Sequence, residues 1–353
     1  MKKLMKLIYI LVLLLIVNNI VFADDFIGHI EENAVSVYDN QGNYIFGTAM
    51  FVTRGDRYID EDNTEYTIEA VNGNRAIARK TDQIDLLDGL SMEERLLTPL
   101  AAKGSKLVGI YHTHNGESYI PGAESAEGKG EIHQVGEIFK NSLEKKGIRV
   151  IQSNNLHLPH DGAAYERSRA TATDLARQRP DAIFDVHRDG IPDKNEYLKE
   201  IDGKLMSQVR LVVGRQNPNG KVNDKFARGL KAIADKQHPG LIRGIFYGSG
   251  NYNQQISPHS LLLEFGTHVT TKEQAAASAE LLSDTINSLL YGGEGTTVRK
   301  SESPSAISTI FWIVGILISG ILIYLLINEG SINGVIKRIK QFFGREIVDR
   351  GDS

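Results

Sequence analysis

Residues 106–119 read KLVGIYHTHNGESY, and this stretch combines a buried-strand pattern with a cluster of ionisable side chains. The apolar run LVGI at 107–110 is typical of a strand covered on both faces. Directly behind it come His112, His114 and Glu117. In open α/β sheets, ligands collect beyond the carboxyl ends of the strands. The stretch therefore predicts an α/β fold and a functional site at the end of this strand.

After this stretch, strand and helix patterns alternate along the chain. The alternation indicates an α/β domain over residues 101–292, with a mostly parallel sheet covered by helices on both faces. The strand candidates are 148–152, 182–186, 208–214, 241–246 and 260–266, and the helix candidates are 131–147, 163–178, 223–237 and 272–290. Residues 24–100 instead alternate apolar and polar positions between turn signals such as Asn72-Gly73-Asn74, and this pattern predicts a small β-rich module.

Both ends of the chain contain hydrophobic segments of different kinds. Residues 1–23 have basic residues, an apolar core and small residues near Ala23, which is typical of a signal peptide, with an uncleaved anchor as the alternative. Residues 307–327 contain no charged side chain and are long enough to cross a bilayer as a helix. Residues 293–306 read as a linker, and the basic tail 328–353 is expected on the cytoplasmic side. These patterns predict a single-pass protein of the cell membrane with its main domain on the extracytoplasmic side.

The composition excludes several kinds of site. The chain of 353 residues has no cysteine, so any metal must bind through His, Asp or Glu. Its net charge of -4 gives no overall basic bias, and we expect no nucleic-acid partner.

Three predicted strands end in ionisable residues that would meet at one edge of a parallel sheet. Two histidines and one carboxylate with an open fourth position make a catalytic zinc centre, and a further carboxylate can carry the proton. The nitrogen ligands would be His114 and His187, and Glu264, inside LLLEFG, would be the base. Asp185 and Arg188 would orient His187 or stabilise an oxyanion.

Several of these segments resemble the motifs of a known family. YHTHNGESYIP, VGEIFKNSLEKKGI, AYERSRAT, DVHRDG and LLLEFG, spread in this order over residues 106–291, resemble stage II sporulation protein P, a family of bacterial cell-wall hydrolases related to zinc-dependent N-acetylmuramoyl-L-alanine amidases. The resemblance implies a zinc amidase fold and cleavage of the amide between muramic acid and the stem peptide of peptidoglycan, in cell-wall remodelling or sporulation. It also suggests endopeptidase action on cross-links and contact with other wall-remodelling proteins.

The resemblance also implies roles for individual residues. It makes His114, or alternatively His112, and His187 the zinc ligands, and Glu264 the catalytic carboxylate. The related amidases place the glutamate ligand at the start of the helix after the first histidine, which here is Glu131. Glu131 is therefore the favoured ligand, and Glu117, which the sporulation proteins share, is its support or the alternative ligand. In the sporulation family, Asn commonly occupies the position of Glu131, and the membrane anchor is usually N-terminal.

Two other functions compete with the amidase. One is a catalytically inactive amidase-like domain that binds peptidoglycan or recruits another hydrolase; a retained Glu264 argues against it, because a binding module needs no base. The other is a metal-dependent phosphohydrolase built on H-x-H, which the lack of a phosphate-cradling glycine loop does not support.

Overall fold

The structure is a computed structural model, and it describes residues 34–87, residues 106–292 and parts of 325–338. The chain divides into two compact units, Met1–Val298 and Arg299–Ser353. In the second unit the described part consists mainly of a short helical stretch over 333–338. The predicted signal peptide and linker lie outside the described residues, as does nearly all of the predicted span 307–327. No helix in the described part has the length and apolar character needed to cross a bilayer.

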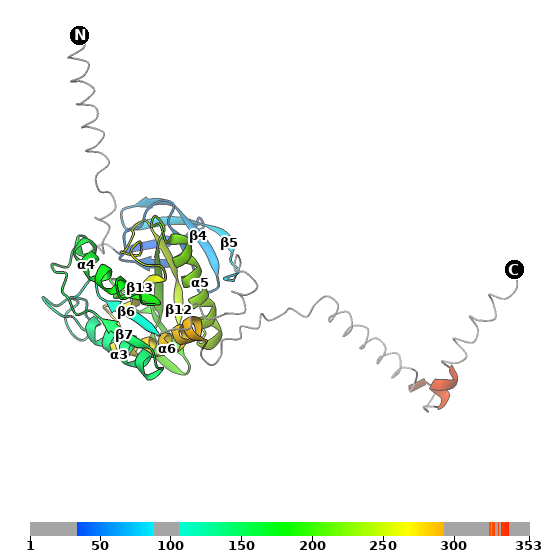
Figure 1. Cartoon of the computed structure of the whole chain (residues 1–353). Coiled ribbons are helices and arrows are strands. Elements are labelled where there is room, and N and C mark those ends of the chain that lie inside the picture. Colours follow the sequence, from blue (N-terminus) through cyan, green and yellow to red (C-terminus); the bar gives the residue numbers. More distant parts are fainter. Residues whose placement is uncertain are drawn as a thin grey trace, which may run out of the picture. The chain divides into compact units, whose positions relative to one another are not determined.

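The first unit contains one sheet of eleven strands in the order β2-β1-β5-β4-β3-β12-β11-β13-β8-β6-β7 (Figure 1). Its strands are β1 (Val35–Tyr38), β2 (Tyr44–Thr48), β3 (Arg57–Ile59), β4 (Thr64–Asn72), β5 (Arg75–Gln83), β6 (Leu107–Tyr111), β7 (Arg149–Gln152), β8 (Ala182–Asp189), β11 (Val209–Gly214), β12 (Ile242–Gly248) and β13 (Ser260–Thr267). The helices are α3 (Ile132–Lys145), α4 (Ala164–Ala176), α5 (Gly220–Gln237) and α6 (Lys272–Tyr291), with a short 3-10 helix η1 (Lys194–Glu196). A separate hairpin pairs β9 (Leu198–Ile201) with β10 (Lys204–Ser207).

The sheet is mixed rather than mostly parallel. Strands β7, β6, β8 and β13 run parallel to one another, as predicted, but β11 and β12 run antiparallel to β13. The N-terminal strands add further antiparallel pairs, because the connections between β3, β4 and β5 are short turns, which can join only antiparallel neighbours. The α/β class holds, and the longest run of parallel neighbours, β7, β6, β8 and β13, is the part of the sheet that carries the predicted site.

The N-terminal strands extend this sheet. Strand β3 pairs with β12, so residues 35–83 continue the sheet of the predicted α/β domain. They also contribute to the core on one face, where Phe46, Tyr58 and Ile68 belong to the same buried cluster as Val212 and Leu262. The predicted β-rich region is therefore packed directly against the face that carries the polar site.

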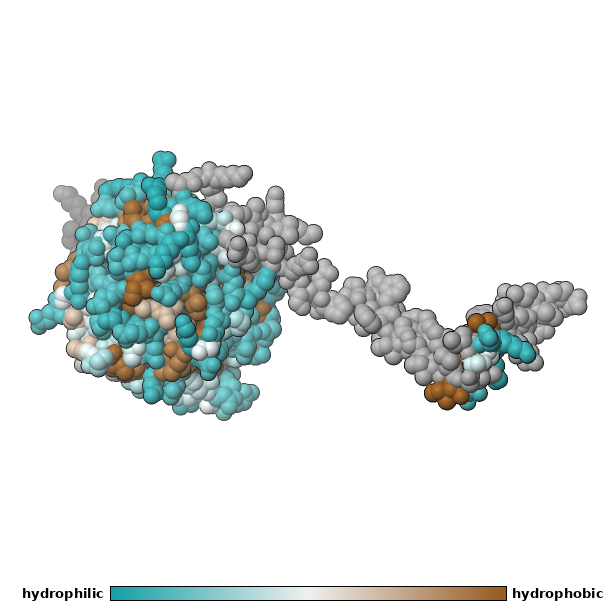
Figure 2. Space-filling view, turned by 90° about the horizontal axis from the view of Figure 1, so that it is seen from below, coloured by the Kyte–Doolittle hydropathy of each residue, from teal (hydrophilic) through white to brown (hydrophobic). Residues whose placement is uncertain are grey.

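Helices cover both faces of the sheet, as predicted. Helices α3, α5 and α6 pack on the face that includes Phe184 and Leu263, while α4 packs on the opposite face against Tyr111 and Ile183 (Figure 1). Strands β6, β8 and β13 are buried along their whole lengths because both faces are covered. The outer surface seen in Figure 2 is mainly hydrophilic over the described residues.

The ends of α6 show how local sequence sets an element's limits. Thr271 caps its start, accepting from the backbone N–H of Gln274, whose side chain in turn accepts from the N–H of Thr271. Gly292 ends the helix in a left-handed conformation with φ of 71°, which glycine adopts without steric cost.

Candidate metal centre

The site is built where β6, β8 and β13 lie side by side. Tyr111 at the end of β6 pairs with Asp185 in β8, and His187, two residues further along β8, pairs with Glu264 in β13. Alternate residues of a strand point to the same face. Asp185, His187 and Glu264 therefore project from the same face, the one covered by α4 and the N-terminal strands.

His114, Glu117 and His187 form a group that could hold a metal ion. One donor atom from each of the three lies within 4.8 Å of the other two. Glu117 Oε1 is 3.2 Å from His114 Nδ1 and 3.2 Å from His187 Nδ1. Ligands about 2.1 Å from a tetrahedral zinc ion are separated by roughly 3.4 Å, so this donor set fits zinc in spacing and in chemistry. All three side chains are fully buried, as expected for a group placed by the fold rather than by a surface loop.

The charges in this group depend strongly on one another. Burial alone would raise the pKa of Glu117, but His187, His114 and Arg188 lower it well below the usual value. Burial alone would lower the pKa of His187, but the carboxylates of Asp185 and Glu117 raise it well above 6.5. The buried carboxylate of Glu117 therefore stays ionised and favours a positive charge beside it.

Asp185 and Arg188 both contact the group. Asp185 Oδ1 lies 2.9 Å from His187 Nε2, the nitrogen on the other side of the ring from Glu117. Thr113 fixes that carboxylate through its backbone N–H (2.8 Å) and its hydroxyl (2.6 Å). The backbone N–H of Arg188 donates to Glu117 Oε2 at 2.8 Å. The Arg188 side chain donates to the carbonyls of Ser118 and Glu124, so it ties the loop after β6 to the end of β8.

Asp185→Asn is expected to weaken zinc binding by about 10–100-fold, the usual effect of removing a carboxylate that orients a histidine ligand. The amide keeps the size of the side chain but loses its charge, so the His187 ring is less firmly held. Isothermal titration of the metal-free protein with zinc measures the change. An affinity equal to that of the wild type would show that Asp185 has no role in orienting His187.

Glu131, the expected glutamate ligand, is not part of the group, and this corrects the sequence-based expectation. Its Oε2 accepts from the backbone N–H of Tyr119 at 3.2 Å, and its Oε1 lies 3.0 Å from Lys272 Nζ. It sits at the N-cap position of α3, where it closes the loop that carries Glu117. Glu117, the alternative glutamate ligand, lies in the group instead.

His112, the alternative histidine ligand, also lies outside the group. Its Nδ1 is 2.9 Å from the carbonyl of Val186, and its ring packs against His133 with centroids 4.4 Å apart. Burial, followed by the effect of His133, lowers the pKa of His112 to about 3. The ring is therefore a neutral part of the packing beneath the site, and of the two histidines in HTH only His114 joins the group.

Glu264 is fully buried in the middle of β13, between β8 and β11. Its Cα partners are His187 on one side and Arg210 on the other. The Arg210 guanidinium is directed to two other carboxylates, Asp189 at 2.7 Å and Glu196 at 2.8 Å. The sheet thus places Glu264 next to His187 of the metal-binding group.

Two aromatic side chains near the group had no separate role in the sequence analysis. The His160 ring stacks on His114 with centroids 4.3 Å apart, and the Tyr165 ring meets His114 edge-on at 5.4 Å. Tyr165 lies within the motif AYERSRAT, but no periodicity or spacing distinguishes it there. Its position in the first turn of α4 places its ring against His114.

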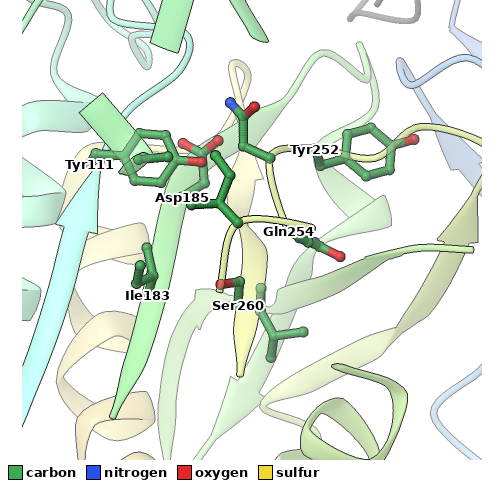
Figure 3. A pocket seen from close by; sticks show the side chains of 10 residues that line it. Tyr111, Ile183, Asp185, Tyr252, Gln254 and Ser260 are labelled. Carbon is green, nitrogen blue, oxygen red and sulfur yellow. The ribbon is translucent and has the colours of Figure 1, made fainter. Parts of the chain in front are cut away.

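A small cavity lies behind Asp185. It has a volume of about 10 Å³, close to the least that holds one water molecule, and its lining includes Tyr111, Asp185 and Ser260. Figure 3 shows Asp185 beside Tyr111, with Tyr252 and Gln254 on the loop at the other side. The cavity is too small for a substrate.

Comparison with known proteins supports the family resemblance of the motifs that contain the site residues. Residues 50–287 match the family model of stage II sporulation protein P (SpoIIP). Stage II sporulation protein P of Bacillus subtilis (strain 168) is 31% identical over 219 residues, which is 56% of this chain and 54% of that protein, so the chain spans about half of its relative's length.

Solved structures of amidases are also similar. The N-acetylmuramyl-L-alanine amidase Ami1 of Mycobacterium smegmatis is 16% identical with a TM-score of 0.36, over 55% of this chain and 99% of that one. Ami1 of Mycobacterium abscessus is 14% identical with a TM-score of 0.35, over 52% of this chain and 98% of that one.

Since the family model matches 238 of the 353 residues, the chain belongs to the stage II sporulation protein P family.

Proposed function

We propose that this protein is a zinc-dependent peptidoglycan hydrolase that cleaves the amide between N-acetylmuramic acid and the L-alanine of the stem peptide. The observation that carries the proposal is the group of His114, Glu117 and His187, with donor atoms within 4.8 Å of one another, beside the buried Glu264. Membership of the stage II sporulation protein P family supports the choice of substrate. Endopeptidase action on cross-links is a second proposed activity of the same site.

The residues of the chain have distinct proposed roles. His114, Glu117 and His187 would hold the metal, and Asp185 and Arg188 would keep His187 and Glu117 in place. Zinc bound there would supply Lewis acidity, which polarises a carbonyl and acidifies water. Glu264 would accept a proton from the attacking water and deliver it to the amide nitrogen as the stem peptide leaves. Removing the proton from water and protonating the amine are the two steps for which a carboxylate is needed.

We also propose that the protein works at the outer side of the cell membrane, within reach of the wall. This placement rests on the sequence patterns of residues 1–23 and 307–327, and other wall-remodelling proteins are the expected partners. A protease-accessibility assay on intact protoplasts tests it. Digestion of the 34–292 region without lysis is expected, and protection of that region would contradict the placement.

Metal removal tests the activity itself. The full-length protein is incubated with purified peptidoglycan, and the products are separated by mass spectrometry. We expect release of stem peptides with a free L-alanine amino group, loss of that release with a zinc chelator, and recovery with zinc but not with magnesium. Release that survives complete chelation would contradict the metal-dependent mechanism. A protein that pellets with the wall but releases nothing would instead favour a binding module.

A further inference from the structure

Tyr165 has a buried hydroxyl that the packing of the described residues does not explain. The residue is 5% exposed and lies in the first turn of α4. Its hydroxyl oxygen is buried and has no hydrogen-bond partner among the residues that the structure describes. A buried polar group without a hydrogen-bond partner destabilises the folded protein. A phenylalanine would avoid that cost, so the hydroxyl needs a reason beyond packing.

The ring of Tyr165 borders the candidate metal centre on two sides. It meets the His114 ring edge-on, with centroids 5.4 Å apart and planes at 68°. It lies nearly parallel to the His187 ring, at 15° and 6.2 Å. The side chain therefore forms a wall of the site next to both histidines.

The Tyr165 side chain can donate a hydrogen bond. A tyrosine hydroxyl loses its proton only near pH 10 in water, so at neutral pH the Tyr165 hydroxyl is a hydrogen-bond donor.

The start of α4 is held in place by the loop after β12. Asn253 Nδ2 donates to the carbonyl of Tyr165 at 2.9 Å and to Ser168 Oγ at 3.0 Å. Tyr252 and Asn253 both have positive φ, 50° and 55°, a conformation that non-glycine residues adopt at a cost. Figure 3 shows Tyr252 on this loop. The loop thus fixes the position of the Tyr165 backbone relative to the sheet.

We propose that the Tyr165 hydroxyl is a catalytic hydrogen-bond donor to the carbonyl oxygen of the scissile amide. The inference rests on the proposed amidase function and assigns it a further residue. As negative charge develops on that oxygen, a fixed donor stabilises it; no proton is transferred, and the hydroxyl is unchanged at the end of the reaction. The partner that the hydroxyl lacks within the protein is then supplied by the substrate.

Tyr165→Phe tests the proposal because it removes only the hydroxyl and keeps the ring against His114 and His187. With a soluble muropeptide as substrate, kcat is expected to fall about 10²–10³-fold with little change in KM, the usual effect of losing one oxyanion donor. The zinc affinity is expected to stay the same, and the melting temperature to stay the same or rise. Binding of a phosphonamidate analogue of the muramoyl–L-alanine bond, measured by calorimetry, is expected to weaken at least tenfold.

Tyr247→Phe is the matched control. Tyr247 is also buried, but it belongs to the core on the other face of the sheet, where its hydroxyl donates to Asp224 at 2.6 Å. Its removal is expected to leave kcat and analogue binding unchanged. The control thus separates the loss of any buried hydroxyl from the loss of this one.

Each contrary outcome has a distinct meaning. Wild-type kcat and analogue binding in Tyr165→Phe would overturn the role of Tyr165 and leave the amidase proposal intact. Loss of zinc binding, or a raised KM with unchanged kcat, would also overturn it, because the hydroxyl would then act on the metal or on substrate binding alone. A wild-type protein that turns over no muropeptide would contradict the proposed function, while unchanged analogue binding in Tyr165→Phe would still count against Tyr165.

Discussion

Glu264→Gln is expected to lower the turnover of a soluble muropeptide by about 10²–10⁴-fold while leaving the zinc content unchanged. The amide has nearly the same size as the carboxylate and fits the same space in β13, but it cannot accept a proton at neutral pH. Because Glu264 is not in the group formed by His114, Glu117 and His187, the metal should remain bound. Zinc content by atomic emission and turnover by chromatography, on the same preparation, measure both quantities.

Glu137→Gln provides a control for this change. Glu137 lies on the exposed side of α3, where its carboxylate pairs with Lys140 at 3.0 Å, and a glutamine there should affect neither zinc content nor turnover. If Glu264→Gln turned over substrate within tenfold of the wild type, Glu264 would not be the base. If it lost zinc, the carboxylate would be a ligand rather than a proton carrier.

Glu117→Gln is expected to weaken zinc binding at least about 100-fold, whereas Glu131→Gln should bind zinc as the wild type does. Glutamine lacks the negative charge that Glu117 presents to both His114 and His187, and its amide is a poor zinc ligand. Glu131 instead pairs with the partly exposed Lys272, a contact worth about 0–1 kcal/mol of folding stability. Calorimetric titration of both metal-free variants with zinc compares them directly.

The two glutamates therefore make a matched pair, since each lies in the region that follows β6 and each is changed to the same residue. Strong zinc binding by Glu117→Gln together with weak binding by Glu131→Gln would restore the assignment expected from the related amidases. Equal losses in both variants would mean that the loop between them, rather than either carboxylate, controls the site.

The positions of His187 and Glu264 could be predicted because they lie within strands. A strand's period of two and the parallel pairing of β8 with β13 bring residues at the strand ends to one edge. Glu117 lies in a loop, and its orientation depends on the backbone N–H of Arg188, 71 positions away. Local patterns do not encode such a contact, so the sequence favoured Glu131 at the helix start.

The packing of the N-terminal strands against the rest of the sheet could not be predicted from the sequence, for a similar reason. Arg210 is fully buried and joins the carbonyl of Gly47 to the carboxylates of Asp189 and Glu196. Asp189 in turn accepts from the backbone N–H of Ala49 at 2.8 Å. These contacts between distant residues tie the N-terminal strands to the end of β8, but each residue alone reads as an ordinary polar position.

The hairpin of β9 and β10 is a different case, because a local signal was present. Asp202-Gly203 lies between two short strands, and both residues have positive φ, 51° and 75°. The Asp-Gly pair is a strong indicator of a two-residue hairpin turn. The flanking segments are short and only partly apolar, so hydrophobic periodicity does not predict the two strands.

Anomalous diffraction at the zinc absorption edge, from crystals of the full-length protein grown with zinc, tests the proposed metal centre most directly. We predict one strong peak bounded by His114, Glu117 and His187, with Glu264 next to it and outside the ligand shell. A peak at Glu131 or between His112 and His133, or no peak inside the fold at full zinc saturation, would contradict the proposal that His114, Glu117 and His187 bind a single metal ion.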